Sequence, residues 1–224
     1  MTTAARLGPM GPTALEPEEI AAALDDLTDW RRHPRALATA YEAGSVPAAL
    51  DLVAAIGAVA EAIDHHPDVD WRYRHVFVRT TTHAAGNRVT GRDVALAARI
   101  STLAAERGIP AVPAAARSYE IGVDAADPAA LAQSWAAALG YRAGPDEDEV
   151  TDPFGRGPTV WFQRTGSPSA SRLHLDVHVA DELQDEVVGS VGASGGRTLD
   201  PSHAPAFVVV ADPDGNRFCI CTAH

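Results

Sequence analysis

The apolar positions of the first half of the chain recur with the 3.6-residue period of amphipathic helices. This period predicts three helices: one that begins near Glu16, one between Ser45 and Asp64, and one between Thr90 and Arg107. Polar and apolar residues alternate over Arg72–Thr82, which predicts a strand, and Ala36–Glu42 predicts a weaker one because alanine is a poor strand former. The first half is therefore predicted to combine helices with a sheet.

The second half contains an internal repeat, which predicts two similar modules. Glu120–Asp127 matches 174–181, and each copy alternates like a strand and ends in an aspartate that can cap a following helix. The turn at 152–155 matches the turn at 212–215, and each turn precedes an apolar strand, at Thr159–Gln163 and Arg217–Cys221. We therefore expect each module to hold a strand, a helix and further strands.

A change in composition separates the two halves. Residues 109–116 read Ile-Pro-Ala-Val-Pro-Ala-Ala-Ala, which is typical of a linker. Residues 1–113 carry 11 arginines against 14 acids, whereas 114–224 carry 7 against 16. We predict a flexible tail at 1–15, a first domain at 16–108, a linker at 109–116 and a second domain at 117–224, in an α+β protein.

Composition and charge narrow the class of partner. The 224 residues carry a net charge of −12, and phosphate binding needs a basic face, so nucleic acid is not expected as a partner. We expect no membrane span, because no uninterrupted apolar run approaches the roughly 20 residues that a span requires. The two cysteines, Cys219 and Cys221, lie two apart in one predicted strand and cannot form a disulfide scaffold. A soluble, cytoplasmic protein that binds a small molecule is predicted.

Three histidines within 19 residues are the strongest candidate chemistry: His65, His66 and His83. Histidine titrates near neutrality, so two of them could exchange a proton with one substrate as acid and base. The alternative is that the pair at the predicted helix end only complements the helix dipole. Glu61 lies one helical turn before His65 and could orient that imidazole. Asp93 is predicted to close a capping box with Thr90.

The segment from about 15 to 107 resembles the pterin-4a-carbinolamine dehydratase family. The resemblance rests on E-x-x-x-H-H-P at 61–67, the tyrosine at 73, the pair Thr82-His83 and the helix opening T-x-x-D at 90–93. It implies an antiparallel sheet with helices on one face, and the loss of water from a 4a-hydroxytetrahydropterin to give a quinonoid dihydropterin, without a cofactor. It assigns acid–base catalysis to His65 and His83, and substrate binding mainly to His66, which is the third candidate catalytic residue. Beside the resemblance, we predict three further substrate-binding residues: Glu61, Trp71 and Asp93.

Residues 117–224 resemble the glyoxalase-like branch of the vicinal oxygen chelate superfamily. The resemblance rests on the repeat, on Arg172–Val179 and on Asp212–Ile220. It implies a paired βαβββ domain, with ligand positions of the metal-dependent members matching Glu120, Trp161 or Gln163, His174 and Cys219. His174 and His178 share one strand face but stand roughly 13 Å apart, so they cannot easily bind one ion. Cys219 and the residue at Trp161 or Gln163 depart from the usual histidine or glutamate, so a complete metal site is not expected. The candidates for holding a divalent metal are Glu120, His174 and Asp176. The alternative is that these residues form the polar lining of a small-molecule cleft or a degenerate site kept for structure.

The predicted function is that of a hydro-lyase that dehydrates a pterin-4a-carbinolamine in pterin recycling. One alternative is a metal-dependent glyoxalase-like or dioxygenase-like enzyme carried by the second domain. Another is a non-catalytic assembly or dimerisation protein. A homo-oligomer, either a dimer or a tetramer, is expected from both resemblances.

Overall fold

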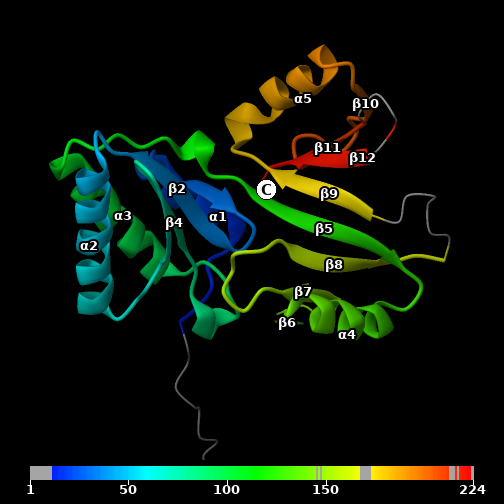
Figure 1. The fold of residues 1–224 in the computed structure, drawn as a ribbon, viewed down its shortest axis with the longest axis horizontal. Helices are drawn as coiled ribbons and strands as arrows, with labels where there is room; N and C mark the ends of the chain where they lie inside the picture. Colours follow the sequence, from blue (N-terminus) through cyan, green and yellow to red (C-terminus); the bar gives the residue numbers. More distant parts are fainter. Residues whose placement is uncertain are drawn as a thin grey trace, which may run out of the picture. The chain divides into compact units, whose positions relative to one another are not determined.

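The structure is a computed structural model that describes residues 12–144, 146, 148–166, 173–211, 215 and 217–222. The chain divides into two compact units, Met1–Pro113 and Ala114–His224 (Figure 1). Each unit combines helices with its own sheet, which confirms the predicted α+β class. Residues 1–11 of the predicted tail lie outside the described residues. At the end of the predicted tail, the amide of Leu15 donates to the carbonyl of Val89 at 2.8 Å.

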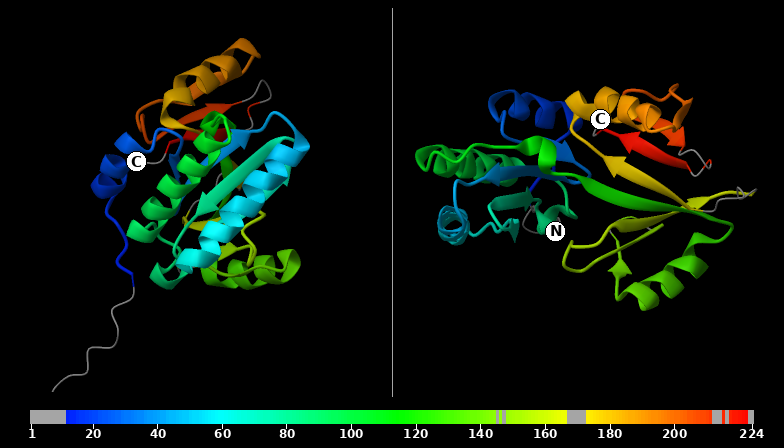
Figure 2. Two further views of the ribbon diagram at one scale, coloured as in Figure 1. Left: turned by 90° about the vertical axis from the view of Figure 1, so that its left-hand side faces the viewer. Right: turned by 45° about the horizontal axis from the view of Figure 1, so that its top comes forward.

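The first unit contains the three predicted helices, and their N-termini are fixed by local sequence. They are α1 (Pro17–Asp26), α2 (Val46–Ile63) and α3 (Gly91–Glu106). Ser45 caps α2 by accepting a hydrogen bond from the amide of Ala48, and Thr90 forms the predicted capping box with Asp93. The left view of Figure 2 shows α2 and α3 side by side across the strands of this unit.

The sheet of the first unit is antiparallel, with strand order β1-β2-β4-β3. Its strands are β1 (Arg31–His33), β2 (Ala36–Glu42), β3 (Asp68–Arg72) and β4 (His75–Thr80). Leu37, Tyr41, Val76 and Val78 pack from one face against residues of all three helices in a single core. The predicted arrangement, with the helices on one face, is confirmed.

The predicted strand Arg72–Thr82 is confirmed only in its middle, where β4 lies, and the prediction was wrong at both ends. Its first residue, Arg72, belongs to β3. Tyr73 adopts φ +54°, so residues 73 and 74 form a turn between β3 and β4. Beyond Thr80 the chain leaves the sheet and enters the short 3₁₀ helix η1 (His83–Ala85). The strand β3 was missed because all five of its residues are exposed and several are charged, which hides the alternation expected of a half-buried strand.

The predicted linker begins as part of the first unit. Ile109 is 5% exposed and lies in the core of this unit. The amide of Glu42 donates to the carbonyl of Pro110 at 3.0 Å, and the amide of Val112 donates to the carbonyl of Ala40 at 2.7 Å. These bonds fix the segment along β2. The 3₁₀ helix η2 (Pro113–Ala115) follows.

The helix α2 is long and apolar enough to cross a membrane by length and composition alone, with a mean hydropathy of 1.8 over its 18 residues. In the structure its buried side chains belong to the core of the first unit: Ala49, Leu52, Ile56 and Ala60. A helix that supplies the core of a domain passes the same test, so this helix is read as a core element.

The second unit has an eight-stranded sheet with the order β10-β11-β12-β9-β5-β8-β7-β6. Its first module contains β5 (Ser118–Ala125), α4 (Pro128–Leu139), β6 (Arg142–Ala143), β7 (Glu149–Thr151) and β8 (Thr159–Arg164). Its second module contains β9 (Leu173–His178), η3 (Asp181–Leu183), α5 (Gln184–Ala193), β10 (Arg197–Asp200), β11 (Phe207–Ala211) and β12 (Arg217–Cys221). The predicted repeat of a strand, a helix and further strands is confirmed. The second copy of the predicted turn lies outside the described residues at 212–214.

The two modules join along one seam, where β5 pairs with β9 in antiparallel register. Val123 and Phe162 belong to a core under α4, and Val210 and Ile220 belong to a core under α5. Successive side chains of a strand point to opposite faces, so the residues between these apolar positions lie on the other face of the sheet. That other face carries most of the titratable side chains of β5, β9 and β12.

Candidate active site

A fully buried carboxylate, Asp93, organises the candidate site of the first unit. It lies in the first turn of α3 and its residue exposure is 0%. The hydroxyl of Thr80 donates to Oδ1 at 2.7 Å, the hydroxyl of Thr82 donates to Oδ2 at 2.7 Å, and the amide of Thr90 donates to Oδ2 at 2.8 Å. Burial alone would raise the pKa of Asp93, but these bonds and one from His65 outweigh it and hold the pKa below its ordinary value. The carboxylate is therefore ionised near neutral pH.

The carboxylate of Asp93 fixes the imidazole of His65. Nε2 of His65 lies 2.8 Å from Oδ1 of Asp93, and both side chains are buried. An ionised carboxylate only accepts hydrogen bonds, so Nε2 donates its proton to Asp93 and Nδ1 is the ring nitrogen left for another partner. Asp93 has no exposed surface, so in this structure its carboxylate contacts His65 and not the solvent. The predicted contact between Asp93 and a substrate stays a prediction.

The second histidine, His83, is oriented from its own loop. Nδ1 of His83 lies 2.7 Å from Oδ1 of Asn87; His83 is exposed and Asn87 is half-buried. With the amide oxygen as acceptor, Nδ1 carries the proton and Nε2 keeps its lone pair. The loop is closed by the amide of Thr82, which donates to the carbonyl of Arg88 at 3.0 Å. Because Thr82 also bonds to Asp93, one carboxylate anchors the segments that carry His65 and His83.

The third histidine, His66, is exposed and pairs with Glu61. Its Nε2 lies 3.1 Å from Oε2 of Glu61, with side-chain exposures of 56% and 84%. The prediction that Glu61 orients His65 is wrong in this structure. The helix ends at Ile63, and Asp64 takes a left-handed conformation with φ +51°, so the spacing of one helical turn no longer applies beyond it. The left-handed residue directs His65 inward and leaves His66 at the surface.

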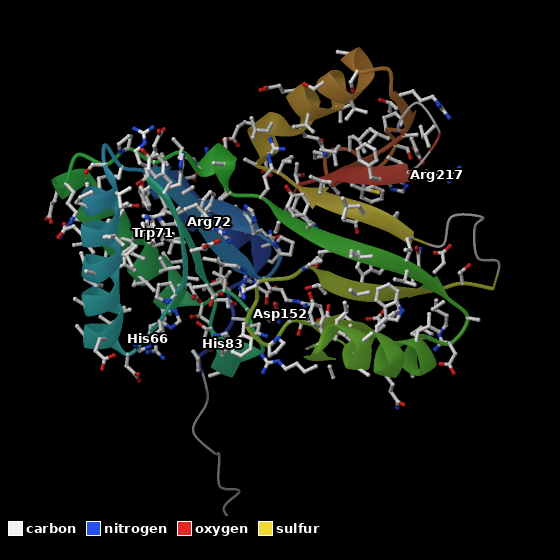
Figure 3. All side chains as sticks on the ribbon, in the orientation of Figure 1. His66, Trp71, Arg72, His83, Asp152 and Arg217 are labelled. Atoms are coloured by element: carbon white, nitrogen blue, oxygen red, sulfur yellow. The ribbon has the colours of Figure 1, made fainter. Side chains whose placement is uncertain are left out.

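Trp71 lies on the edge strand β3 and is 44% exposed. Its indole N–H donates to the carbonyl of Tyr73 at 2.6 Å, within the β3–β4 turn. In the view of Figure 3, His66 and His83 lie toward one end of the first unit, and Trp71 lies farther along. Trp71 is an exposed aromatic side chain beside the site, and none of the described contacts joins it to the histidines.

Sequence reasoning missed Arg92, which holds the turn before His65 from outside. Its guanidinium donates to the carbonyl of Ile63 at 3.2 Å and to the carbonyl of Asp64. These are among the carbonyls that a helix C-terminus leaves without intrahelical partners. The first turn of α3 therefore fixes the loop after α2 twice, through Arg92 to its backbone and through Asp93 to His65.

We expect Arg92→Ala to loosen this turn and to lower the activity of the site about tenfold, with little change in the stability of the core, because Arg92 is exposed. Arg92→Lys should recover part of the loss, since an ammonium can still reach one carbonyl. Arg99→Ala, on an exposed part of the same helix, is the matched control. Steady-state rates of all three variants measure the effect, and equal rates for Arg92→Ala and Arg99→Ala would contradict it.

Sequence reasoning also missed Thr80, Thr82 and Asn87, each of which makes a hydrogen bond that fixes a histidine or Asp93. The signal for the two threonines was present, because alternate residues of a strand lie on one face. The signal for Asn87 was weaker, because asparagine after glycine is also an ordinary turn sequence.

The second unit gathers the other predicted site residues on the face of the sheet opposite its helices. Nε2 of His178 lies 3.1 Å from Oε2 of Glu120, and Nε2 of His174 lies 3.6 Å from Oδ1 of Asp176. The indole N–H of Trp161 donates to Oδ2 of Asp176 at 3.1 Å. Burial raises the pKa of Asp176 above its ordinary value, against the opposing effect of His174 and the other neighbours.

The residues of this face do not fit the metal centre that the superfamily resemblance implied. At the matched position that is either Trp161 or Gln163, the indole offers no lone pair and the amide is exposed. Glu120 and His174 direct their polar atoms to partners within the sheet. Among the described residues, no three histidine, cysteine, aspartate or glutamate side chains are grouped so that they could hold one ion. We therefore derive no chemical step through a metal here.

The first unit thus holds two histidines whose rings are oriented by Asp93 and Asn87, an arrangement suited to acid–base chemistry. Residues 13–103 match the family of pterin 4 alpha carbinolamine dehydratases, and residues 120–221 match a glyoxalase-like domain. Among curated relatives, a protein of Nocardia farcinica is 46% identical over 90 residues, which are 40% of this chain and 94% of the relative. A protein of Roseiflexus castenholzii is 39% identical over 89 residues, which are 40% and 95%. Both are named "Putative pterin-4-alpha-carbinolamine dehydratase". The chain belongs to the pterin-4a-carbinolamine dehydratase family through its first unit.

Two solved structures are each similar to part of the chain. A transcriptional coactivator/pterin dehydratase from Brucella melitensis is 28% identical, with a TM-score of 0.40, and the match covers 41% of this chain and 99% of that protein. A member of the glyoxalase/bleomycin resistance protein/dioxygenase superfamily from Vibrio splendidus is 19% identical, with a TM-score of 0.34, and the match covers 48% and 100%.

Proposed function

We propose that the first unit is a hydro-lyase that dehydrates a pterin-4a-carbinolamine. The family and the names of the relatives support this assignment. In the reaction the bond between C4a and its hydroxyl oxygen breaks, N5 loses a proton, and the products are water and a quinonoid dihydropterin. No electrons are gained or lost, so the step needs only an acid and a base and requires no cofactor.

In this proposal His65 and His83 are the acid–base pair. One imidazole takes the proton from N5 and the other, protonated, gives a proton to the departing hydroxyl. His66 binds the substrate at the surface, where its pair with Glu61 sets its orientation. Trp71 is assigned to the edge of the substrate site, and Asp93 positions His65. Which of the two catalytic histidines is the acid is left open, because each can serve in either direction.

A single observation carries the proposal: the bond between Nε2 of His65 and the buried carboxylate of Asp93. It leaves Nδ1 as the only nitrogen of that ring that can exchange a proton with a substrate. An imidazole held in one tautomer against an ionised carboxylate is suited to proton transfer at neutral pH. A purely structural histidine would not need its second nitrogen free.

The test is the rate at which the purified chain dehydrates a 4a-hydroxytetrahydropterin that is produced in a coupled hydroxylase reaction. The rate with the chain is compared with the spontaneous rate, in the presence of the same concentration of an unrelated protein. We expect a clear acceleration that is proportional to the concentration of the chain. A folded chain that leaves the spontaneous rate unchanged would refute the proposal and favour a non-catalytic assembly role.

The proposal includes a soluble homo-oligomer in the cytoplasm. The edge strand β3 supports assembly, because it pairs on one side with β4 and exposes the apolar side chains of Val69 and Trp71. An edge of this kind can pair with another strand.

A further inference from the structure

The polar face of the second unit is organised across the seam between its two modules. Glu120 of β5 lies opposite Asp176 of β9, and Gly122 lies opposite His174. Trp161 of β8 lies beside Gly122 in the parallel pair of β5 and β8. These residues therefore lie on one face, with contributions from both modules, where a metal-dependent relative would collect its ligands.

The first link across the seam is the pair of Glu120 and His178. Their side chains are 24% and 14% exposed, and Oε2 and Nε2 are 3.1 Å apart. The other ring nitrogen of His178, Nδ1, is buried and has no hydrogen-bond partner. His178 therefore depends on Glu120 for the one strong polar contact that its imidazole makes.

The second link joins Trp161 to β9. The indole N–H of Trp161 donates to Asp176, and its ring packs edge-on against the imidazole of His174 at a centroid distance of 5.4 Å. The imidazole of His174 lies directly over Gly122, because a Cβ built on that glycine would be 2.3 Å from a ring carbon. Because Gly122 has no side chain, the imidazole of His174 can lie against the backbone of β5.

We infer that four side chains of this face hold the two modules together in place of a metal ion. We call this set the latch; its members are Glu120, His178, Trp161 and Asp176. The carboxylate of Glu120 pairs with His178, and the carboxylate of Asp176 accepts a hydrogen bond from Trp161. Each of these two contacts joins the first module to the second. A metal could bind Glu120 or His174 only after these contacts were broken. Glu120 and Asp176 thus have hydrogen-bond partners on the neighbouring module, His178 and Trp161, in the place where a bound cation would otherwise balance the two carboxylates.

Hydrogen exchange on the full chain tests the latch. We expect Glu120→Gln to raise the exchange rate of peptides that cover β5 and β9 about tenfold, because a charged hydrogen bond between the modules is lost. Trp161→Phe should act in the same direction on β9, although tryptophan is not a metal donor. Glu186→Gln, at an exposed position of α5, removes a carboxylate outside the latch and should leave these rates unchanged.

Metal content distinguishes the latch from a cation site. The chelator-treated chain is mixed with zinc, nickel or manganese alone, separated from free metal and analysed for bound ion. The wild type and Glu120→Gln should retain equal amounts, since ions on the first unit's exposed histidines contribute equally to both. One additional equivalent in the wild type would overturn the inference. So would exchange rates in β5 and β9 that are the same for Glu120→Gln and Glu186→Gln.

Discussion

His65→Gln is expected to lower the rate of carbinolamine dehydration by about 10²- to 10⁴-fold, the contribution of one well-placed acid–base group. Glutamine can still donate a hydrogen bond toward Asp93, so the buried network keeps a donor at this place. It cannot accept and release a proton near neutral pH, so the chemical step loses its base or acid. The measurement is kcat and KM in the coupled hydroxylase assay.

The matched control is His66→Gln, which changes the neighbouring histidine. His66 is exposed and bonded only to the exposed Glu61 among the described residues, so we expect a rise in KM with a smaller effect on kcat. His83→Gln should resemble His65→Gln. If His65→Gln kept kcat within about threefold of the wild type, the assignment of acid–base chemistry to the buried histidine would be wrong.

Asp93→Ala is expected to cost about 3–5 kcal/mol of folding stability and to abolish activity. The substitution leaves the hydroxyls of Thr80 and Thr82, the amide of Thr90 and Nε2 of His65 without their common acceptor inside the protein. Each unsatisfied buried donor costs about 1–3 kcal/mol, and part of this is recovered by relaxation. Urea unfolding at neutral pH measures the loss.

The same carboxylate predicts how stability depends on pH. The pKa of Asp93 is lower in the folded chain than its ordinary value of 3.8, so the folded state favours the ionised form. Its contribution is present at pH values above the unfolded pKa and is lost as the pH falls through the folded pKa. Stability should therefore fall more steeply below pH of about 4 in the wild type than in Asp93→Asn. The measurement is urea unfolding of both chains at a series of acidic pH values; equal slopes of stability against pH would contradict the prediction.

Much of the fold could be predicted from local sequence. Ser45 and Thr90 begin helices because their side chains accept hydrogen bonds from free amides of the first turn, a purely local interaction. The repeat in the second half predicted two modules because each copy has its own strand alternation and an aspartate after the strand. The predicted caps were wrong, because the side chain of Asp127 caps no amide of α4 and Asp181 lies inside η3. The exposed strand β3 could not be predicted in this way, since its pairing with β4 is a contact between strands and its side chains carry no buried pattern.

The residue types of the site were also evident from the sequence, but their partners were not. Local sequence was enough to place three histidines at a helix end and a strand end, and Asp93 in the cap of α3. The packing of the elements was needed to show that Asp93 binds His65 and that Glu61 binds His66. It was also needed to show that Glu120 binds His178 and that Asp176 binds Trp161 across the seam. The physical reason is that capping depends on neighbours within a few residues. A hydrogen bond between side chains 28 or 58 residues apart depends on how helices and strands pack.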